Sequence, residues 1–143
     1  MLGSFMVDFL FGKDIMKVYI SGKIGEEIIS DATREKFAKA EAKLKAEGFE
    51  VFNPCAEEWQ MHLKVKYKKD KEAYQPYTDG VMPDFYTYCL LRDLMALSVK
   101  DAIYMLPDFL ESKGAKAEHA FAIASGMKVI YDEELYNNGT LRR

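Results

Sequence analysis

The feature that most constrains the fold of this chain is an apolar run at residues 102–106, which a polar loop separates from a helical pattern. A run of this length, rich in branched and aromatic residues, is typical of a buried strand. After the loop, small and aromatic apolar residues recur at helical spacing at positions 117, 120, 121 and 124, which predicts a helix. A strand that leads through a short loop into a helix is typical of α/β folds, which bind ligands at the carboxyl ends of their strands.

A strand–helix–strand unit occupies the first third of the chain. The apolar run at 17–21 predicts a strand, and Asp31 is a suitable N-cap for the helix that follows. Gly48 is the expected C′ glycine of that helix, and residues 49–52 form the next predicted strand, which an Asn-Pro pair ends. Such a unit implies parallel strands joined by a right-handed crossover.

The whole pattern predicts a single doubly wound α/β domain of the Rossmann or flavodoxin type, with a parallel sheet of four to five strands in the order 2-1-3-4. Residues 55–83 are the least regular part, interpreted as a helix and a loop. That segment is either a variable surface excursion or a lid that offers aromatic side chains to a base. After this segment, the sequence predicts a helix at 84–99, a strand at 101–106, a helix at 114–125 and a strand at 127–131. The tail from residue 132 is expected to be short and polar.

Length and charge limit the classes of protein to which the chain can belong. At 143 residues it corresponds to one domain; residues 1–15 are interpreted as an N-terminal extension, and residues 16–143 as the domain. A net charge of −3 and a pI near 5.5 argue against a protein that binds a nucleic acid polymer. A mononucleotide is not excluded, because one or two local donors can hold it.

The N-terminal residues and the cysteines indicate the compartment. The apolar stretch at 1–11 is too short to span a bilayer, and it lacks the positive n-region and the cleavage site of a signal peptide. Cys55 and Cys89 show no metal-binding spacing, so we expect reduced thiols, with neither a disulfide nor a metal site. These features predict a cytoplasmic protein without a membrane role.

Two loops that follow strands are candidates for binding a phosphate or a sugar hydroxyl. The first follows the strand at 17–21 and contains two glycines, and the second carries a serine and a glycine at the start of a predicted helix. Both are expected at the switch point of the sheet, where backbone N–H groups can hold an anion. The first loop lacks the spacing of known nucleotide-binding motifs, so a tight strand–helix turn is the alternative. The candidate binding residues are Ser21, Gly22, Lys23, Ile24, Gly25, Ser112, Gly114 and Lys116.

Two acidic residues are candidates for catalysis, and each has a structural alternative. Glu118 lies near the start of a predicted helix, with its carboxylate toward the same crevice, but an acid there also interacts favourably with the helix dipole. Asp93 lies on the helix at 84–99, where it is either functional, a solvated surface residue or a partner of Arg92. Asp101 is either functional or simply a residue at the start of a strand.

The candidate residues follow one another in a recognisable order. A first strand carries Tyr19 and ends in Ser-Gly, an Asp-Leu pair begins at Asp93, Asp101 heads a strand, and a Ser-x-Gly-x-x-x-Glu segment runs from Ser112 to Glu118. This order resembles the nucleoside 2-deoxyribosyltransferase superfamily, which includes the deoxynucleoside 5′-monophosphate N-glycosidases. The resemblance covers residues 16 to about 131 and extends to small uncharacterised proteins of the DUF4406 type.

The resemblance implies an enzyme that hydrolyses or transfers the N-glycosidic bond of a nucleotide or nucleoside without a cofactor. It assigns Glu118 as the nucleophile on the anomeric carbon, Asp93 as the residue that binds the sugar or assists proton transfer, and Tyr19 as the residue that orients Glu118. At the position of Ser112 the monophosphate hydrolases carry a serine that meets the 5′-phosphate, whereas the transferases carry an aspartate. Serine favours a nucleoside 5′-monophosphate, because a carboxylate would repel the phosphate. A homodimer or higher homo-oligomer is also implied.

The segment around Glu118 departs from the family's pattern, which usually has glycines beside the glutamate. Here Lys116 and Ala117 precede Glu118, and His119 follows it. Lys116 is a further candidate for holding phosphate. Catalysis requires an ionised Glu118, which a helix N-terminus favours. The alternative function is a non-catalytic nucleotide-binding or sensor module on the same fold.

Overall fold

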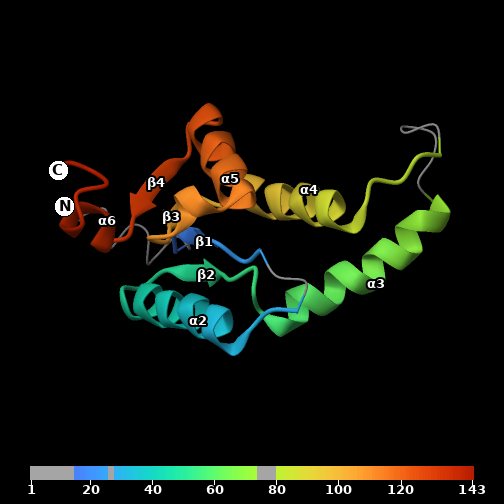
Figure 1. Ribbon diagram of the computed structural model, residues 1–143, viewed down its shortest axis with the longest axis horizontal. Coiled ribbons are helices and arrows are strands. Elements are labelled where there is room, and N and C mark those ends of the chain that lie inside the picture. Colours follow the sequence, from blue (N-terminus) through green and yellow to red (C-terminus); the bar gives the residue numbers. More distant parts are fainter. Residues whose placement is uncertain (1–14, 26–27, 74–79) are drawn as a thin grey trace, which may run out of the picture.

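Four parallel strands form the centre of the molecule: β1 (Lys17–Ser21), β2 (Glu50–Phe52), β3 (Ala102–Met105) and β4 (Lys128–Tyr131). The computed structural model describes residues 15–25, 28–73 and 80–143. The strands lie in the order β2-β1-β3-β4 (Figure 1), and every neighbouring pair is parallel. The predicted fold class and strand order are confirmed.

Helices cover both faces of the sheet, as in a doubly wound fold. On one face α2 (Asp31–Ala46) packs against β1 and β2. On the other face α5 (Lys113–Ala124) packs against β1, β3 and β4, and also against α4 (Phe85–Ser98). The long helix α3 (Glu57–Ala73) contacts α4 and extends away from the sheet (Figure 1).

Alternate side chains of β1 enter two separate cores. Val18 and Ile20 lie in the core beneath α2, whereas Tyr19 lies in the core beneath α4 and α5. All three are fully buried, because successive side chains of a strand point to opposite faces. Ser21 is two residues from Tyr19, so both face the side of the sheet that carries Glu118.

The helix ends follow capping rules, with one correction to the prediction. Ser30, and not Asp31, is the N-cap of α2, and its hydroxyl accepts a hydrogen bond from the Thr33 N–H at 3.2 Å. Asp31 is instead the first helical residue, where its charge meets the positive end of the helix dipole. Gly48 and Gly126 have φ angles of 95° and 74°, as expected for glycines that end helices.

The C-terminal tail is more structured than its polar composition predicts. It contains α6 (Glu134–Asn137), in which Leu135 is fully buried. Leu141 packs against the same core, which lies beneath α4 and α5. The prediction of a merely polar tail is wrong because two isolated leucines produce no periodic signal. A 3-10 turn, η1 (Phe109–Glu111), also lies within the loop after β3, with Phe109 buried.

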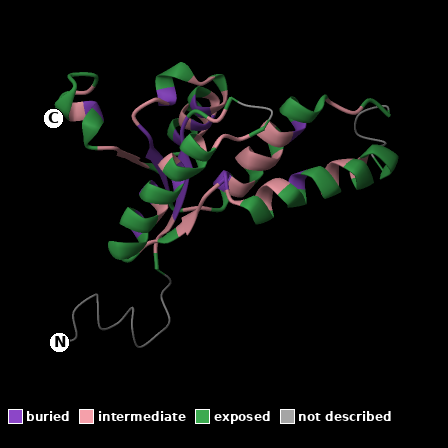
Figure 2. Ribbon diagram, turned by 60° about the horizontal axis from the view of Figure 1, so that its bottom comes forward, coloured by how far each residue is buried: buried purple, intermediate pink, exposed green. Residues whose placement is uncertain are grey.

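The irregular segment at 55–83 is helical over most of the residues that the structure describes. Figure 2 shows that α3 is largely exposed, and Leu63 is its buried residue. Tyr67 packs edge-on against Phe85 and Tyr88, which joins α3 to α4. Residues 74–79 of this segment lie outside the described residues, so the prediction of a lid loop is not addressed there.

The N-terminal extension predicted at 1–15 falls outside the described residues except for Ile15, which is exposed. In the ranges that are described, no helix combines the length and the apolar character needed to cross a membrane. Cys55 and Cys89 form no disulfide.

We expect Gly22→Ala to destabilise the fold by about 1–3 kcal/mol. A Cβ atom at Gly22 would lie 2.6 Å from Cδ1 and 2.9 Å from Cβ of Leu106, so the strand end or the leucine would have to move. The matched control is Gly114→Ala, whose Cβ would lie 3.7 Å from the nearest atom, and it should change stability by less than about 1 kcal/mol. Urea unfolding measures both variants, and equal midpoints would contradict the packing argument.

Candidate functional site

Glu118 is the buried carboxyl group at the centre of the candidate site. It lies in α5 and is 6% exposed. The Ser21 hydroxyl donates to its Oε1 at 2.7 Å, and the Tyr19 hydroxyl donates to its Oε2. Both carboxyl oxygens therefore accept a hydrogen bond from a buried hydroxyl of β1. Tyr19 makes the contact that its predicted orienting role requires, and Ser21, predicted as a ligand-binding residue, contacts Glu118 as well.

Asp93 of α4 is the second carboxyl group of the site. Its Oδ1 accepts a hydrogen bond from Nε1–H of Trp59 at 2.8 Å. It lies close enough to Glu118 and Tyr19 for its negative charge to raise the pKa of both. The structure therefore brings together the three residues to which the resemblance assigns catalysis, although they come from three separate elements.

Burial controls the protonation of the two carboxyl groups. Loss of solvent raises the pKa of Glu118 to about 8; the charge of Asp93 adds to this, and the bonds from Tyr19 and Ser21 oppose it. Burial likewise raises the pKa of Asp93 to about 7, against the effect of the Trp59 bond. Burial therefore acts against the expectation that the helix N-terminus keeps Glu118 ionised. Between these two pKa values the pair holds one proton.

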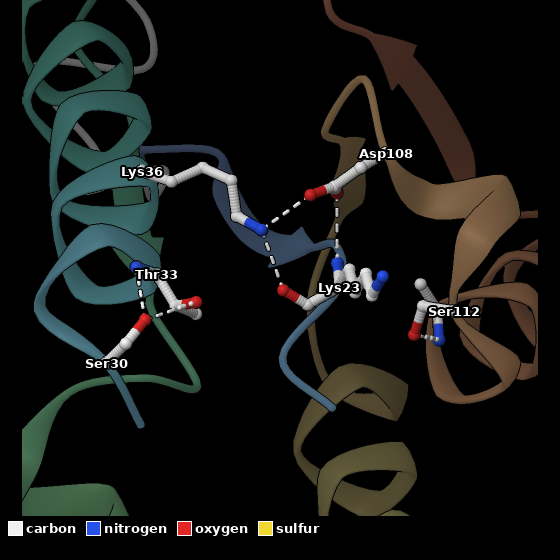
Figure 3. Close-up of polar contacts among 7 residues, drawn as sticks. Lys23, Ser30, Thr33, Lys36, Asp108 and Ser112 are labelled. Carbon is white, nitrogen blue, oxygen red and sulfur yellow. Dashed lines mark hydrogen bonds and ion pairs between the residues drawn. The ribbon is translucent and has the colours of Figure 1, made fainter. Parts of the chain in front are cut away.

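The loop after β1 is tied to two neighbouring elements (Figure 3). The Lys23 N–H donates to Oδ1 of Asp108 at 3.0 Å. The Lys36 ammonium group of α2 donates to the Lys23 carbonyl at 2.7 Å and to Oδ2 of Asp108 at 2.5 Å. The Lys23 N–H is thus engaged by a carboxylate, and a phosphate could use it only by displacing Asp108.

The other residues of this loop have packing roles. The close approach that Gly22 permits is to the Leu106 side chain. Ile24 packs against the core beneath α2, and Gly25 has a φ angle of 54°, a conformation that glycine adopts readily. These contacts give Gly22, Ile24 and Gly25 packing or backbone roles in the described part of the loop.

The loop before α5 presents a hydroxyl group and a helix N-terminus. Ser112 is the N-cap of α5, and its Oγ accepts a hydrogen bond from the Ala115 N–H at 3.1 Å. Its hydroxyl proton remains available for a further acceptor. A Cβ added to Gly114 would lie 3.7 Å from the Tyr86 hydroxyl, so this tyrosine of α4 reaches the loop. Lys116 is exposed.

Two other polar residues of the predicted pattern have structural partners. Nε2 of His119 lies 2.8 Å from the Tyr131 hydroxyl, and its ring packs against Phe109. Burial lowers the pKa of His119, which favours the neutral imidazole. Asp101 accepts a hydrogen bond from the Lys17 N–H at 2.8 Å and so joins the starts of β1 and β3. None of these contacts involves the carboxyl pair.

Trp59 and Tyr86 are the residues of the site that sequence reasoning did not identify. The sequence places Trp59 among the scattered aromatic residues of 55–83, and nothing in its local pattern indicates that it reaches α4. One signal was present: the single tryptophan of the chain lies shortly after the Asn-Pro pair that follows β2, at the sheet edge where α/β folds bind ligands.

An open hollow of about 410 Å³ lies on the other face of the sheet, between α2 and β3. Its lining includes Lys36, Lys43, Tyr104 and Asp132, and Tyr104 belongs to the core beneath α2. We place the candidate site at the carboxyl pair, because burial raises the pKa of both of its acids, and such shifts are typical of functional sites. Among the residues described, no three His, Cys, Asp or Glu side chains gather where they could hold a metal ion.

Comparison with known proteins identifies the family of this chain. A family model, the domain of unknown function DUF4406, matches residues 16–131. The matched segment contains all four strands and every residue of the carboxyl pair and its donors. No curated protein sequence matches the chain. The chain belongs to the DUF4406 family.

Proposed function

We propose that the protein cleaves the N-glycosidic bond of a (deoxy)nucleoside 5′-monophosphate, by hydrolysis or by transfer, with Glu118 as the nucleophile. The proposal includes membership of the nucleoside 2-deoxyribosyltransferase superfamily. The observation that carries it is the buried Glu118 carboxyl group, held at both oxygens by Tyr19 and Ser21 with Asp93 close by. A carboxylate fixed in this way can trap or stabilise the oxocarbenium-like centre that forms when such a bond breaks.

The two carboxyl groups have separate roles in the proposed reaction. In the reacting form the proton of the pair lies on Asp93 and not on Glu118, whose pKa is the higher. The Glu118 carboxylate then attacks the anomeric carbon while the carbon–nitrogen bond breaks and its electron pair leaves with the base. Asp93 gives its proton to the departing base. In hydrolysis, water attacks the glycosyl ester, returns a proton to Asp93 and releases the Glu118 carboxylate. In transfer, a second base replaces water.

The 5′-phosphate binds, in this proposal, at the start of α5. The Ser112 hydroxyl retains a proton to donate, the Tyr86 hydroxyl lies near Gly114, and Lys116 contributes an exposed positive charge. The helix N-terminus adds backbone donors and a favourable dipole. A dianionic phosphate is therefore better suited to this end of the site than an uncharged hydroxymethyl group.

The test is turnover by the purified protein. Each nucleoside 5′-monophosphate and each nucleoside, in the ribo and deoxy series, is incubated with and without an acceptor base, and free or exchanged base is detected by chromatography. Base release in proportion to the amount of protein would support the proposal. No release or exchange from any of these compounds, across the pH range of the two carboxyl pKa values, would overturn it.

A non-catalytic nucleotide-binding or sensor module is the second candidate. It is favoured by burial, which raises the pKa of Glu118 to about 8. A protonated carboxyl group donates a hydrogen bond to a sugar but attacks no carbon. Calorimetry with the same compounds separates the two candidates, because saturable binding without base release would identify a module.

We expect Ser112→Asp to raise KM for nucleoside 5′-monophosphates by about 10- to 100-fold. Aspartate is as good an N-cap as serine, so α5 keeps its first turn, but its carboxylate repels the phosphate. The matching nucleosides lack the phosphate and should show little change in KM. Steady-state kinetics on each nucleotide–nucleoside pair measures this difference, and an equal change for both members would contradict the phosphate position.

A further inference from the structure

Trp59 connects α3 to the carboxyl pair over a long separation in sequence. Its Nε1–H donates to Oδ1 of Asp93 at 2.8 Å, although the two residues are 34 positions apart. An indole N–H is a donor that cannot accept. The hydrogen bond from the Trp59 N–H to this oxygen of Asp93 is therefore stronger when the Asp93 carboxyl group is ionised.

Aromatic neighbours hold the indole ring in place. The ring packs edge-on against Phe52, with centroids 5.0 Å apart and an interplanar angle of 78°. It also stacks on His62 at 5.3 Å and 26°. Phe52 in turn stacks on Tyr19 at 5.3 Å and 13°, because the register of β1 and β2 pairs these two residues. The indole ring is therefore held by aromatic contacts with β2 and within α3, in addition to its hydrogen bond to Asp93.

The same row of rings supplies a hydrogen-bond donor to each carboxyl group. At one end the Tyr19 hydroxyl donates to Glu118, and at the other end the Trp59 N–H donates to Asp93. Phe52 lies between the two donors and contacts both rings. The relative placement of the two acids thus depends on three packed aromatic side chains from β1, β2 and α3.

We propose that Trp59 is a positioning residue that holds Asp93 in the orientation in which it gives its proton to the leaving base. The hydrogen bond strengthens as Asp93 loses the proton, and an interaction that is stronger in the transition state than in the ground state accelerates the reaction. The catalytic part of this inference rests on the proposed function. The hydrogen bond and its dependence on Asp93 can be tested without turnover.

The ionisation of Asp93 is the quantity that the Trp59 bond changes. Burial raises the pKa of Asp93 to about 7, and the Trp59 bond opposes this rise, so loss of the bond raises the pKa further. The ionisable groups around the two residues are Glu118 on α5, Tyr19 on β1, Cys89 on α4 and His62 on α3.

The hydrogen bond can be followed directly, because Trp59 is the only tryptophan of the chain and gives a single indole cross-peak in a ¹⁵N–¹H spectrum. We expect this peak to move with pH, with a midpoint near the Asp93 pKa of about 7. Asp93→Asn should abolish the movement, whereas His62→Gln and Glu118→Gln should retain it. A peak that does not move in the wild-type protein, or that still titrates in Asp93→Asn, would overturn the proposal.

Kinetics of Trp59→Phe test the positioning role, because phenylalanine keeps an aromatic ring beside Phe52 and lacks the donor. We expect kcat at neutral pH to fall about 10- to 100-fold, with a smaller change in KM. Because Asp93 must be protonated to act as the acid, the alkaline limb of the pH–rate profile should move to higher pH. A Trp59→Phe enzyme with the wild-type profile would overturn the positioning role, whatever its absolute rate. If the wild-type protein shows no turnover, the proposed function fails, while the indole titration still decides whether Trp59 responds to Asp93.

Discussion

Glu118→Gln is expected to lower kcat by at least about 1000-fold on the nucleotide that the protein cleaves fastest, as removal of a covalent nucleophile does. An amide has nearly the shape of the carboxyl group but cannot form the glycosyl ester. Tyr19 and Ser21 donate to the two oxygens of Glu118, and their hydroxyls can rotate to accept from an amide N–H. The variant should therefore fold, so a loss of activity reflects the loss of the nucleophile and not a loss of the folded structure.

The control for this variant is the same substitution at an exposed acid. Glu35 lies on α2 and forms a surface ion pair with Lys39 at 3.4 Å, an interaction of little energetic weight. Glu35→Gln should leave kcat within about twofold of the wild-type value. Steady-state kinetics and circular dichroism on both variants complete the test. A folded Glu118→Gln protein that keeps more than about a tenth of the wild-type kcat would exclude Glu118 as the nucleophile.

The stability of the protein is expected to fall by about 5 kcal/mol as the pH rises from near 4 to above 8, through the ionisation of Glu118 beside Asp93. In the unfolded chain a glutamate ionises near pH 4.3, whereas burial raises the pKa of Glu118 in the folded protein to about 8. Between these values the folded protein retains a proton that the unfolded chain has lost. The stabilisation from that proton is complete below the unfolded pKa and is lost as the pH rises to the folded pKa.

Other groups add to this trend or oppose it. Asp93, whose pKa burial raises to about 7, contributes in the same direction as Glu118, whereas His119, whose pKa burial lowers, adds stability as the pH rises. Among the described residues, the carboxyl groups whose pKa is lowered are Glu41, Asp70 and Asp84. They contribute stability that is lost only at lower pH. Urea unfolding at a series of pH values measures the effect. Glu118→Gln should flatten the curve, and parallel curves for the two proteins would contradict a buried, ionisable Glu118.

The strand order could be predicted from the sequence because its signals are local. The apolar runs at 17–21 and 102–106 each lead through a short loop into a helical pattern, and Gly48 and Gly126 end the helices. Parallel strands joined in this way leave few possible topologies. The N-cap of α2 and the helix α6 were missed for the same reason, since a one-residue shift and two isolated leucines produce little local signal.

The candidate site could be predicted only in part. Tyr19, Asp93 and Glu118 were found through the order of motifs, and the structure brings them together. The two loops predicted to bind phosphate differ in the structure. The Lys23 N–H of the first loop already donates to Asp108, whereas the Ser112 hydroxyl of the second loop can still donate a hydrogen bond to a ligand. The nucleotide substrate, the homo-oligomer and the cytoplasmic location stay predictions.

The sequence by itself determined the four strands, their order in the sheet and the helices with a clear apolar pattern, because these depend on short-range periodicity and on the few topologies open to parallel strands. Only the tertiary structure decided that Trp59 donates a hydrogen bond to Asp93 and that burial raises the pKa of Glu118. The first depends on the packing of rings from three elements, and the second on how completely α5 and β1 remove a carboxyl group from water. Contacts and burial of this kind involve residues that are far apart in the sequence, so local sequence patterns do not predict them.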